Sequence, residues 1–257
     1  MFSARRVRAT TYPQPSSGWD LGDSLIISHR HRFIFLKTRK TAGTSEEIAL
    51  SRLCGPDDVI TPVSAEDEAL RQELGYPGPQ NTAIPAHLVR PFDRLRGWLS
   101  RQPPQFVNHA TAEYVQRHVD PEIWRSYFKF CFERNPYDKA ISRYFWSTRE
   151  ASRPRPIADF LGHAKRRQIS NWQIYTVRDE IAVDFVGRFE HLQEDLIAAL
   201  AQLGLEVELP LPRAKSRYRR DKRHYSQVLD SSSRALVERM CARELAAFGY
   251  PWEGAPQ

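Results

Sequence analysis

A short loop rich in lysine and hydroxyl side chains follows an apolar run at residues 33–36. The run, Phe-Ile-Phe-Leu, is typical of a buried strand, because it is short and consists of residues that favour β-structure. Residues 44–46 then begin a helical pattern that continues through EEIALSRL. A strand, a tight loop and a helix N-terminus bring backbone N–H groups together, and the helix dipole favours negative charge there. The segment therefore predicts a ligand that carries a phosphate or a sulfate group.

The side chains of the loop strengthen this predicted anion site. Lys40 adds a positive charge, and Gly43 lets the backbone approach a ligand closely. Thr41, Thr44 and Ser45 add hydroxyl donors. The loop is not a Walker A motif, because its lysine precedes a single glycine, whereas the Walker A lysine follows the second of two glycines.

A second anion site is predicted in the segment RNPYDKAISRY, which follows the apolar strand pattern FKFCFE. Arg134 stands at the end of that strand, Asn135 can cap the next helix, and Pro136 suits the first helical turn. Ser142 then lies about two turns along the helix, on the same side as Arg134. One guanidinium and one hydroxyl on the same side suit a second phosphate group.

These two segments resemble the sulfotransferases that use 3′-phosphoadenosine-5′-phosphosulfate (PAPS). KTAGTS resembles the core of their 5′-phosphosulfate loop, and more narrowly that of the carbohydrate group that includes heparan sulfate 2-O-sulfotransferase. Arg134 and Ser142 resemble the family's Arg–Ser pair that binds the 3′-phosphate. VDFVGRFEHLQEDL and ELAAFGYPW extend the resemblance, in patches, from about residue 31 to residue 252. Family members usually have proline before the loop lysine, where this chain has Arg39.

The resemblance implies an α/β protein with a P-loop-like three-layer fold, in which helices flank a central, mainly parallel sheet. It implies PAPS as the sulfate donor, 3′-phosphoadenosine-5′-phosphate (PAP) as the product, and no metal. The basic run at residues 213–223 corresponds to a flexible basic segment of the family. The residues implied to contact the nucleotide are Lys37, Thr38, Lys40, Thr41, Ala42, Gly43, Thr44, Ser45, Arg134, Ser142, Lys215 and Arg217.

Sulfuryl transfer requires a group that takes the proton of the acceptor hydroxyl. His109, in QFVNHATAEYV, resembles the histidine that this group of sulfotransferases carries before the Arg-Asn-Pro strand, and it is the preferred base. His87 is the second candidate, because it lies in the segment expected to shape the acceptor pocket. Lys40 is expected to stabilise charge on the departing oxygen, which makes it the second catalytic residue.

The expected acceptor is a hydroxyl group on a carbohydrate or a glycolipid, which follows from the resemblance alone. Two alternatives remain open: a P-loop-type nucleotide or small-molecule kinase, and a non-enzymatic polyanion-binding protein. The net charge of +7, from 38 Lys and Arg against 31 Asp and Glu, favours acidic partners in all three cases. No nucleic-acid-binding motif is present in the sequence.

The 257 residues are enough for one domain. We expect an irregular arm at 1–22 and a single sulfotransferase domain at 23–257. Within it, the proline-rich stretch at about 55–105 is predicted to be an irregular insertion with one short helix at 64–74.

The main predicted strands lie at residues 25–36, with the polar HRHR segment as a weak point, at 128–133 and at 181–189. The main predicted helices follow the remaining periodic segments. They cover residues 45–53, 111–118, 136–149, 157–166, 191–205 and 232–248.

Cysteine usage and the N-terminus predict a cytoplasmic location. The three cysteines form neither a CxxC pair nor a zinc signature, which suits a reducing compartment. The N-terminal residues lack the apolar region of a signal peptide, and no stretch reaches transmembrane length. Animal Golgi sulfotransferases that resemble this chain carry a membrane anchor. Because no stretch of the sequence is long and apolar enough to be one, we expect a bacterial type of enzyme.

Overall fold

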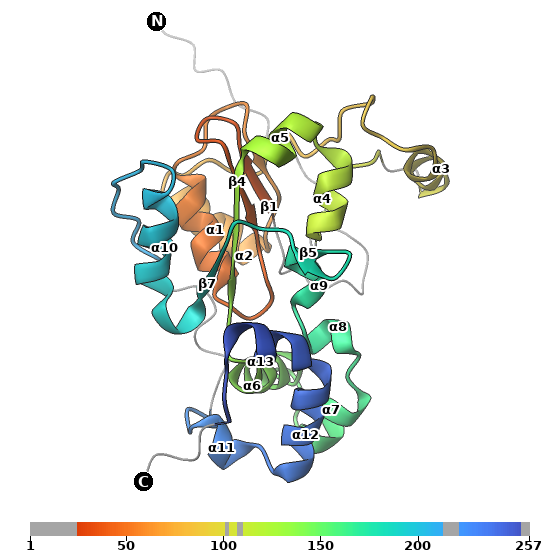
Figure 1. The fold of residues 1–257 in the computed structure, drawn as a ribbon, viewed down its shortest axis with the longest axis vertical. Helices are drawn as coiled ribbons and strands as arrows, with labels where there is room; N and C mark the ends of the chain where they lie inside the picture. Colours follow the sequence, from red (N-terminus) through yellow and green to blue (C-terminus); the bar gives the residue numbers. More distant parts are fainter. Residues whose placement is uncertain (1–24, 101–102, 107–109, 213–220, 253–257) are drawn as a thin grey trace, which may run out of the picture.

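The computed structural model describes residues 25–100, 103–106, 110–212 and 221–252. The predicted arm at 1–22 lies outside these ranges. Within them, helices cover both faces of a central sheet, so the expected α/β class is confirmed (Figure 1). The division into one domain stays a prediction.

The central sheet has five strands in the described part of the chain. Strands β2, β4 and β7 are parallel to one another, and β1 is antiparallel to both of its neighbours, β2 and β3. Four of the five strands therefore run in one direction, which confirms a mainly parallel sheet. In spatial order the strands are β3 (Val59–Ile60), β1 (Leu25–Ser28), β2 (Phe33–Leu36), β4 (Phe128–Glu133) and β7 (Phe185–Arg188).

The strand predicted over 25–36 is broken at its weak point, the HRHR segment, and forms the β1–β2 hairpin. The polar HRHR residues are the turn, and Ser28 pairs with Phe33 across it. Asp58, far along the chain, holds this turn: its carboxylate accepts hydrogen bonds from the amides of His29 (2.6 Å) and Arg30 (3.1 Å). A distant carboxylate thus satisfies backbone donors that a continuous strand would have paired with a neighbouring strand.

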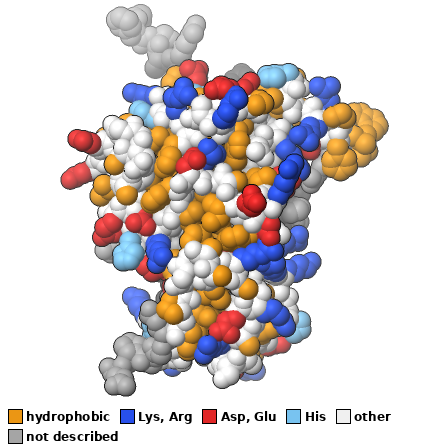
Figure 2. All heavy atoms as spheres, in the orientation of Figure 1, with side chains coloured by type: hydrophobic (Ala, Val, Ile, Leu, Met, Phe, Trp, Pro, Cys, Tyr) orange, Lys and Arg blue, Asp and Glu red, His pale blue; other side chains and the backbone are white. Residues whose placement is uncertain are grey.

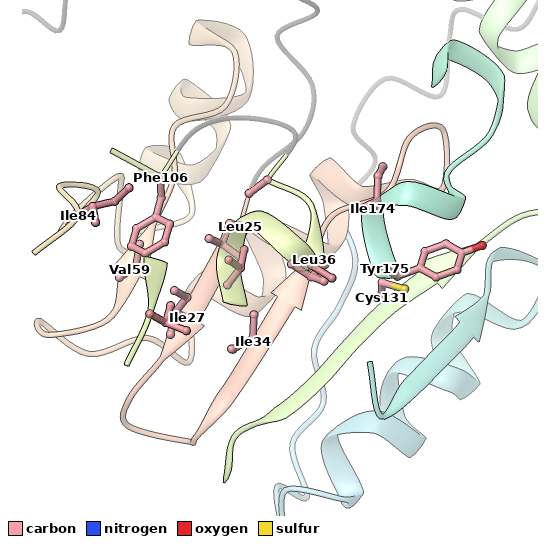
Figure 3. Packing of buried hydrophobic residues seen from close by; sticks show 14 of the residues in the cluster. Leu25, Ile27, Ile34, Leu36, Val59, Ile84, Phe106, Cys131, Ile174 and Tyr175 are labelled. Carbon is pink, nitrogen blue, oxygen red and sulfur yellow. The ribbon is translucent and has the colours of Figure 1, made fainter. Parts of the chain in front are cut away.

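Alternate residues of the strands face two separate apolar layers. Phe35 and Phe130 pack under α1 (Gly43–Ser51) and α10 (Leu192–Ala201) on one face. On the other face, the strands pack against α4 (Ala112–His118) and α9 (Trp172–Tyr175), as Figure 3 shows for the residues around Leu36, Cys131 and Tyr175. The sheet is the middle of three layers.

A third apolar cluster lies among helices below the sheet in Figure 1, centred on α6 (Pro136–Ser147). The final helix predicted over 232–248 is interrupted at Cys241, whose backbone leaves helical geometry (φ −117°, ψ 24°). The other helices of this cluster are α7 (Ile157–His163), α8 (Arg166–Ile169), α11 (Tyr225–Val228), α12 (Ser231–Met240) and α13 (Ala242–Phe248).

The proline-rich stretch at 55–105 contains more regular structure than expected. The predicted helix at 64–74 is present as α2 (Ala65–Glu73), with Ser64 as its N-cap. A further helix, α3 (Pro91–Ser100), was not predicted. The strand predicted at 181–189 is divided between β6 and β7. The remaining elements are α5 (Pro121–Ser126), β5 (Thr176–Val177), β6 (Glu180–Ile181) and the 3₁₀ helix η1 (Phe189–His191).

Candidate functional site

Residues 37–43, here called the anion loop, connect β2 to the N-terminus of α1. Lys40 and Ala42 adopt left-handed backbone conformations (φ 63° and 65°), which are uncommon for residues other than glycine. The Ala42 carbonyl accepts the amide of Ser45 at 2.7 Å. The amides of Gly43 and Thr44 have no acceptor among the described residues, as expected for the first turn of a helix. The loop therefore offers unused N–H groups at a helix N-terminus, which is a site for an anion.

Gly43 is required by close packing of the loop. A Cβ atom at this position would lie 2.5 Å from Cγ of Lys37. Lys37 has little freedom to move away, because its buried ammonium donates to Glu47 at 3.1 Å. The backbone of the loop can adopt this path only with a hydrogen atom in place of a side chain.

Three side chains that are predicted to contact the nucleotide are buried and have partners inside the protein. Lys37 pairs with Glu47, as described above. Thr38 donates its hydroxyl to the carbonyl of Phe132 on β4, and its Oγ1 lies 2.9 Å from Oγ1 of Thr41. These side chains attach the anion loop to the sheet, and their role in binding a nucleotide stays a prediction.

Arg134 joins the anion loop to α6. Its Nε donates to the Asp138 carboxylate at 2.8 Å, and Nη2 contacts the same oxygen. Its Nη1 donates to the Lys40 carbonyl at 2.9 Å. The guanidinium carbon also lies 4.0 Å from the centre of the Phe189 ring. The structure therefore brings together Arg134 and Lys40, which the sequence placed in two separate segments.

Ser142 lies on the face of α6 that is turned toward the anion loop. Asp138, Ser142 and Trp146 are each four residues apart, so they form one stripe along the helix. Asp138, at one end of the stripe, contacts Arg134, and the Trp146 ring, at the other end, lies 4.7 Å from the Lys40 ammonium. Ser142 stands between them on this stripe, and its part in a second anion site stays a prediction.

Trp146 lies beside the anion loop, although it was not among the predicted site residues. Its half-buried indole contacts the Lys40 ammonium and also the Arg149 guanidinium, at 4.2 Å from the ring centre. The indole thus holds two cations at the edge of the anion loop. The helical spacing from Ser142 is the only signal that could have identified it.

Asn171 is a buried residue that holds the main chain of the anion loop. Its Oδ1 accepts the Arg39 amide at 3.0 Å, and its Nδ2 donates to the Arg39 carbonyl at 3.1 Å. Nδ2 also donates to the Glu133 carboxylate at 3.1 Å. These contacts give a reason why position 39 is not proline, since a proline has no N–H to donate to Asn171. A single asparagine in SNWQ carried no signal for this role.

A buried charge network supports Asn171 from below. Glu133 accepts hydrogen bonds from Lys139 (2.8 Å) and from the Tyr175 hydroxyl (3.1 Å). Burial raises the pKa of Glu133, while the Lys139 ammonium acts in the opposite direction. Glu244, carried by α13, accepts the Asn171 amide at 3.0 Å. Because α6, α9 and α13 all contribute to the network, the position of Asn171 is fixed by three elements.

Glu46, in the first turn of α1, is a further buried carboxyl close to the loop. Neither of its oxygens has a hydrogen-bond partner among the described residues. Burial raises the pKa of Glu46 well above its ordinary value of 4.5, although Lys37 acts in the opposite direction. Burial therefore keeps this carboxyl neutral to a higher pH in the folded protein than in the unfolded chain.

One of the two predicted bases, His87, lies in the part of the chain that the structure describes. His109 lies outside the described ranges, as do Lys215 and Arg217. His87 is exposed in the segment before α3. His118 is buried and has two partners, the Tyr114 carbonyl and the Asp93 carboxylate. The choice between His109 and His87 stays a prediction.

A search of the described residues finds no group of three or more His, Cys, Asp or Glu side chains placed to hold a metal ion. Cys54, Cys131 and Cys241 are buried and unbridged. In the part of the chain that the structure describes, every helix is too short or too polar to cross a bilayer.

Comparison with known proteins identifies the chain's relatives. A family model described as the sulfotransferase family matches residues 23–251. An uncharacterized protein of Archaeoglobus fulgidus is 31% identical over 102 residues, which are 38% of this chain and 85% of that protein. No solved structure matches significantly. Since the family model spans most of the chain and includes the anion loop, Arg134 and Ser142, the chain belongs to the sulfotransferase family.

Proposed function

We propose that this protein transfers the sulfuryl group of PAPS to an acceptor hydroxyl, on a carbohydrate or a glycolipid. The observation that carries the proposal is the bond from Arg134 to the Lys40 carbonyl, because it joins two predicted anion sites into one. PAPS carries a 5′-phosphosulfate and a 3′-phosphate on one nucleoside. A ligand with two anionic groups suits a site with two sets of donors.

In this proposal the anion loop binds the 5′ end of the donor. The unused amides of Gly43 and Thr44 and the hydroxyls of Thr44 and Ser45 hold the phosphate. Lys40 rests over the Trp146 ring and turns toward the bridging oxygen when the donor binds. A cation–π contact of roughly 0.5–2 kcal/mol is weak enough to exchange for a contact with a phosphate oxygen.

Arg134 and Ser142 bind the 3′-phosphate. The Asp138 carboxylate and the Lys40 carbonyl fix the plane of the guanidinium before the ligand arrives, so little side-chain freedom is lost on binding. Lys215 and Arg217 are proposed to add contacts to the nucleotide.

The proposed reaction is a single in-line displacement. His109 takes the proton of the acceptor hydroxyl while the hydroxyl oxygen forms a bond to sulfur. The bond from sulfur to the bridging oxygen breaks, and PAP leaves with the electron pair. Lys40 stabilises the negative charge that develops on this oxygen. Fixed cations and amides carry the charge that Mg²⁺ carries in kinases, so the proposed mechanism uses no metal.

Ligand binding tests the donor site. PAP is expected to raise the melting temperature, and ATP with Mg²⁺ is not. Lys40→Ala is expected to lower PAPS-dependent turnover by a factor of about 10²–10³, as for the loss of other groups that stabilise charge in a transition state. Stabilisation by ATP with Mg²⁺ alone would instead favour the kinase alternative, and unchanged turnover in Lys40→Ala would refute the role of this lysine.

Transfer of radiolabelled sulfate from PAPS to a panel of oligosaccharides, glycolipids and small alcohols identifies the acceptor class. With the best acceptor, His109→Ala is expected to lower kcat by about 10²–10⁴, the usual contribution of a general base. His87→Ala tests the second candidate, and His163→Ala, an exposed histidine on α7, is the matched control. A normal kcat in His109→Ala together with a large loss in His87→Ala would exchange the two roles.

A further inference from the structure

Helix α3 turns its apolar side away from the protein. Phe92, Leu95, Trp98 and Leu99 are 72%, 54%, 76% and 69% exposed. Their spacing places them on one stripe of the helix. Figure 1 shows α3 standing at the edge of the molecule, and Figure 2 shows the hydrophobic side chains gathered there. A surface helix ordinarily buries such a stripe against the core, so α3 has the opposite orientation.

A specific contact on the other side of α3 fixes this orientation. The Asp93 carboxylate lies 3.0 Å from Nε2 of His118, which is buried on α4. At about 100° per residue, Asp93 lies nearly opposite the centre of the apolar stripe. Arg94 adds a bond from Nη2 to the Ala86 carbonyl at 2.9 Å. The polar face of α3 is thus attached to the protein, and the apolar stripe is free to meet a partner.

The charge around the stripe indicates the kind of partner. Arg90 and Arg94 are exposed near the N-terminal end of the stripe, and Asp93 is the only acidic residue in the sequence between 90 and 101. An apolar stripe that contains tryptophan and is bordered by arginines is typical of a helix that lies in the interface of an anionic bilayer. Docking of a second copy of the chain through the same face would instead bring these arginines together.

We propose that α3 binds the surface of an anionic lipid bilayer. The apolar stripe enters the boundary between headgroups and acyl chains, and the arginines contact lipid phosphates. The proposal concerns a surface distinct from the anion loop, and it stands whether or not PAPS is the donor.

Cosedimentation of the full chain with vesicles tests the proposal. The protein is expected to bind vesicles of phosphatidylcholine mixed with phosphatidylglycerol, and to bind pure phosphatidylcholine at least tenfold more weakly. Trp98→Asp is expected to lower binding to the anionic vesicles at least tenfold, and Arg94→Gln severalfold with a weaker dependence on salt. Ile197→Asp is the matched control, because Ile197 is an exposed apolar residue on α10, and it is expected to bind as the wild type does.

Melting curves by circular dichroism show whether each variant is folded. Equal binding of Trp98→Asp and the wild type would overturn the proposal, and so would a wild-type chain that stays in the supernatant with anionic vesicles. If the wild type ignores vesicles but is a dimer by light scattering, and Trp98→Asp is a monomer, the stripe belongs to a contact between copies of the chain.

Discussion

Replacing Asn171 with alanine removes the side chain that holds the main chain of the anion loop. Three hydrogen bonds are lost: two with the amide and the carbonyl of Arg39, and one with the Glu133 carboxylate. The loop then keeps its attachments through Thr38 and Arg134. We expect the protein to fold with lower stability and the loop to lose its fixed position.

The expected loss in the free energy of unfolding of Asn171→Ala follows from the hydrogen-bond partners of Asn171. Two neutral hydrogen bonds contribute about 1 kcal/mol each, and a bond to a charged group contributes about 1.5–3 kcal/mol. The expected loss in the free energy of unfolding is therefore about 3–5 kcal/mol, a large part of the roughly 5–15 kcal/mol that is typical of a folded protein. For a chain of this size, the melting temperature should fall by roughly 10 °C.

Urea unfolding followed by circular dichroism measures the loss, and calorimetric titration with PAP measures the effect on the loop. Arg39→Ala is the matched control: Asn171 bonds to the amide and the carbonyl of Arg39, so this variant keeps both bonds and loses the bond from the Arg39 side chain to the Arg167 carbonyl. Its expected cost is below about 1 kcal/mol. A loss below about 1 kcal/mol for Asn171→Ala, or equal losses for the two variants, would refute the reasoning.

Two further changes test the surroundings of the loop. Gly43→Ala should lower the free energy of unfolding by about 1–3 kcal/mol and weaken PAP binding, because the new methyl group meets Lys37. Urea unfolding measures this loss. Gly162→Ala is the control: its methyl group enters open space on α7, so the variant should be as stable as the wild type or slightly more stable. Glu46→Gln tests the buried carboxyl through the pH dependence of stability. Because burial raises the pKa of Glu46 in the folded state, the wild type keeps the stability of the neutral carboxyl below pH 4.5 and loses it as the pH rises toward the raised value. The glutamine variant stays neutral, so its stability relative to the wild type should rise by up to about 1.4 kcal/mol per pH unit across that window. A stability difference that does not change with pH would contradict the burial of an uncharged Glu46.

The sequence was sufficient for those parts of the site that depend on near neighbours. The Asn135 side chain caps α6 by accepting the Tyr137 amide at 3.0 Å, as the Asn-Pro pair predicted. The short apolar runs before the anion loop and before Arg134 are the buried strands β2 and β4, which lie side by side in parallel. Capping and strand burial are controlled by residues a few positions apart, so their patterns are visible in the chain itself.

Contacts between distant segments decided the remaining features. The polar HRHR segment marked a weak point in the predicted strand, but its partner in the hairpin turn is the Asp58 carboxylate, which lies far along the chain. The break at Cys241 likewise separates two helices that the periodicity joins into one. At the hairpin the deciding partner is a remote carboxylate, and at Cys241 the break falls on a residue that is buried in the helical cluster.

By itself, the sequence determined that a strand, a loop and a helix N-terminus offer an anion site, and that Arg134 and Ser142 offer another. Only the tertiary structure decided that Lys37 and Thr38 hold the loop from inside, that Asn171 fixes its backbone, and that Arg134 bonds to it directly. The physical reason is that the direction of a side chain and its contacts with residues far along the chain depend on the fold. A sequence pattern states which groups are present, but the fold decides which way each side chain points and which remote partner satisfies it.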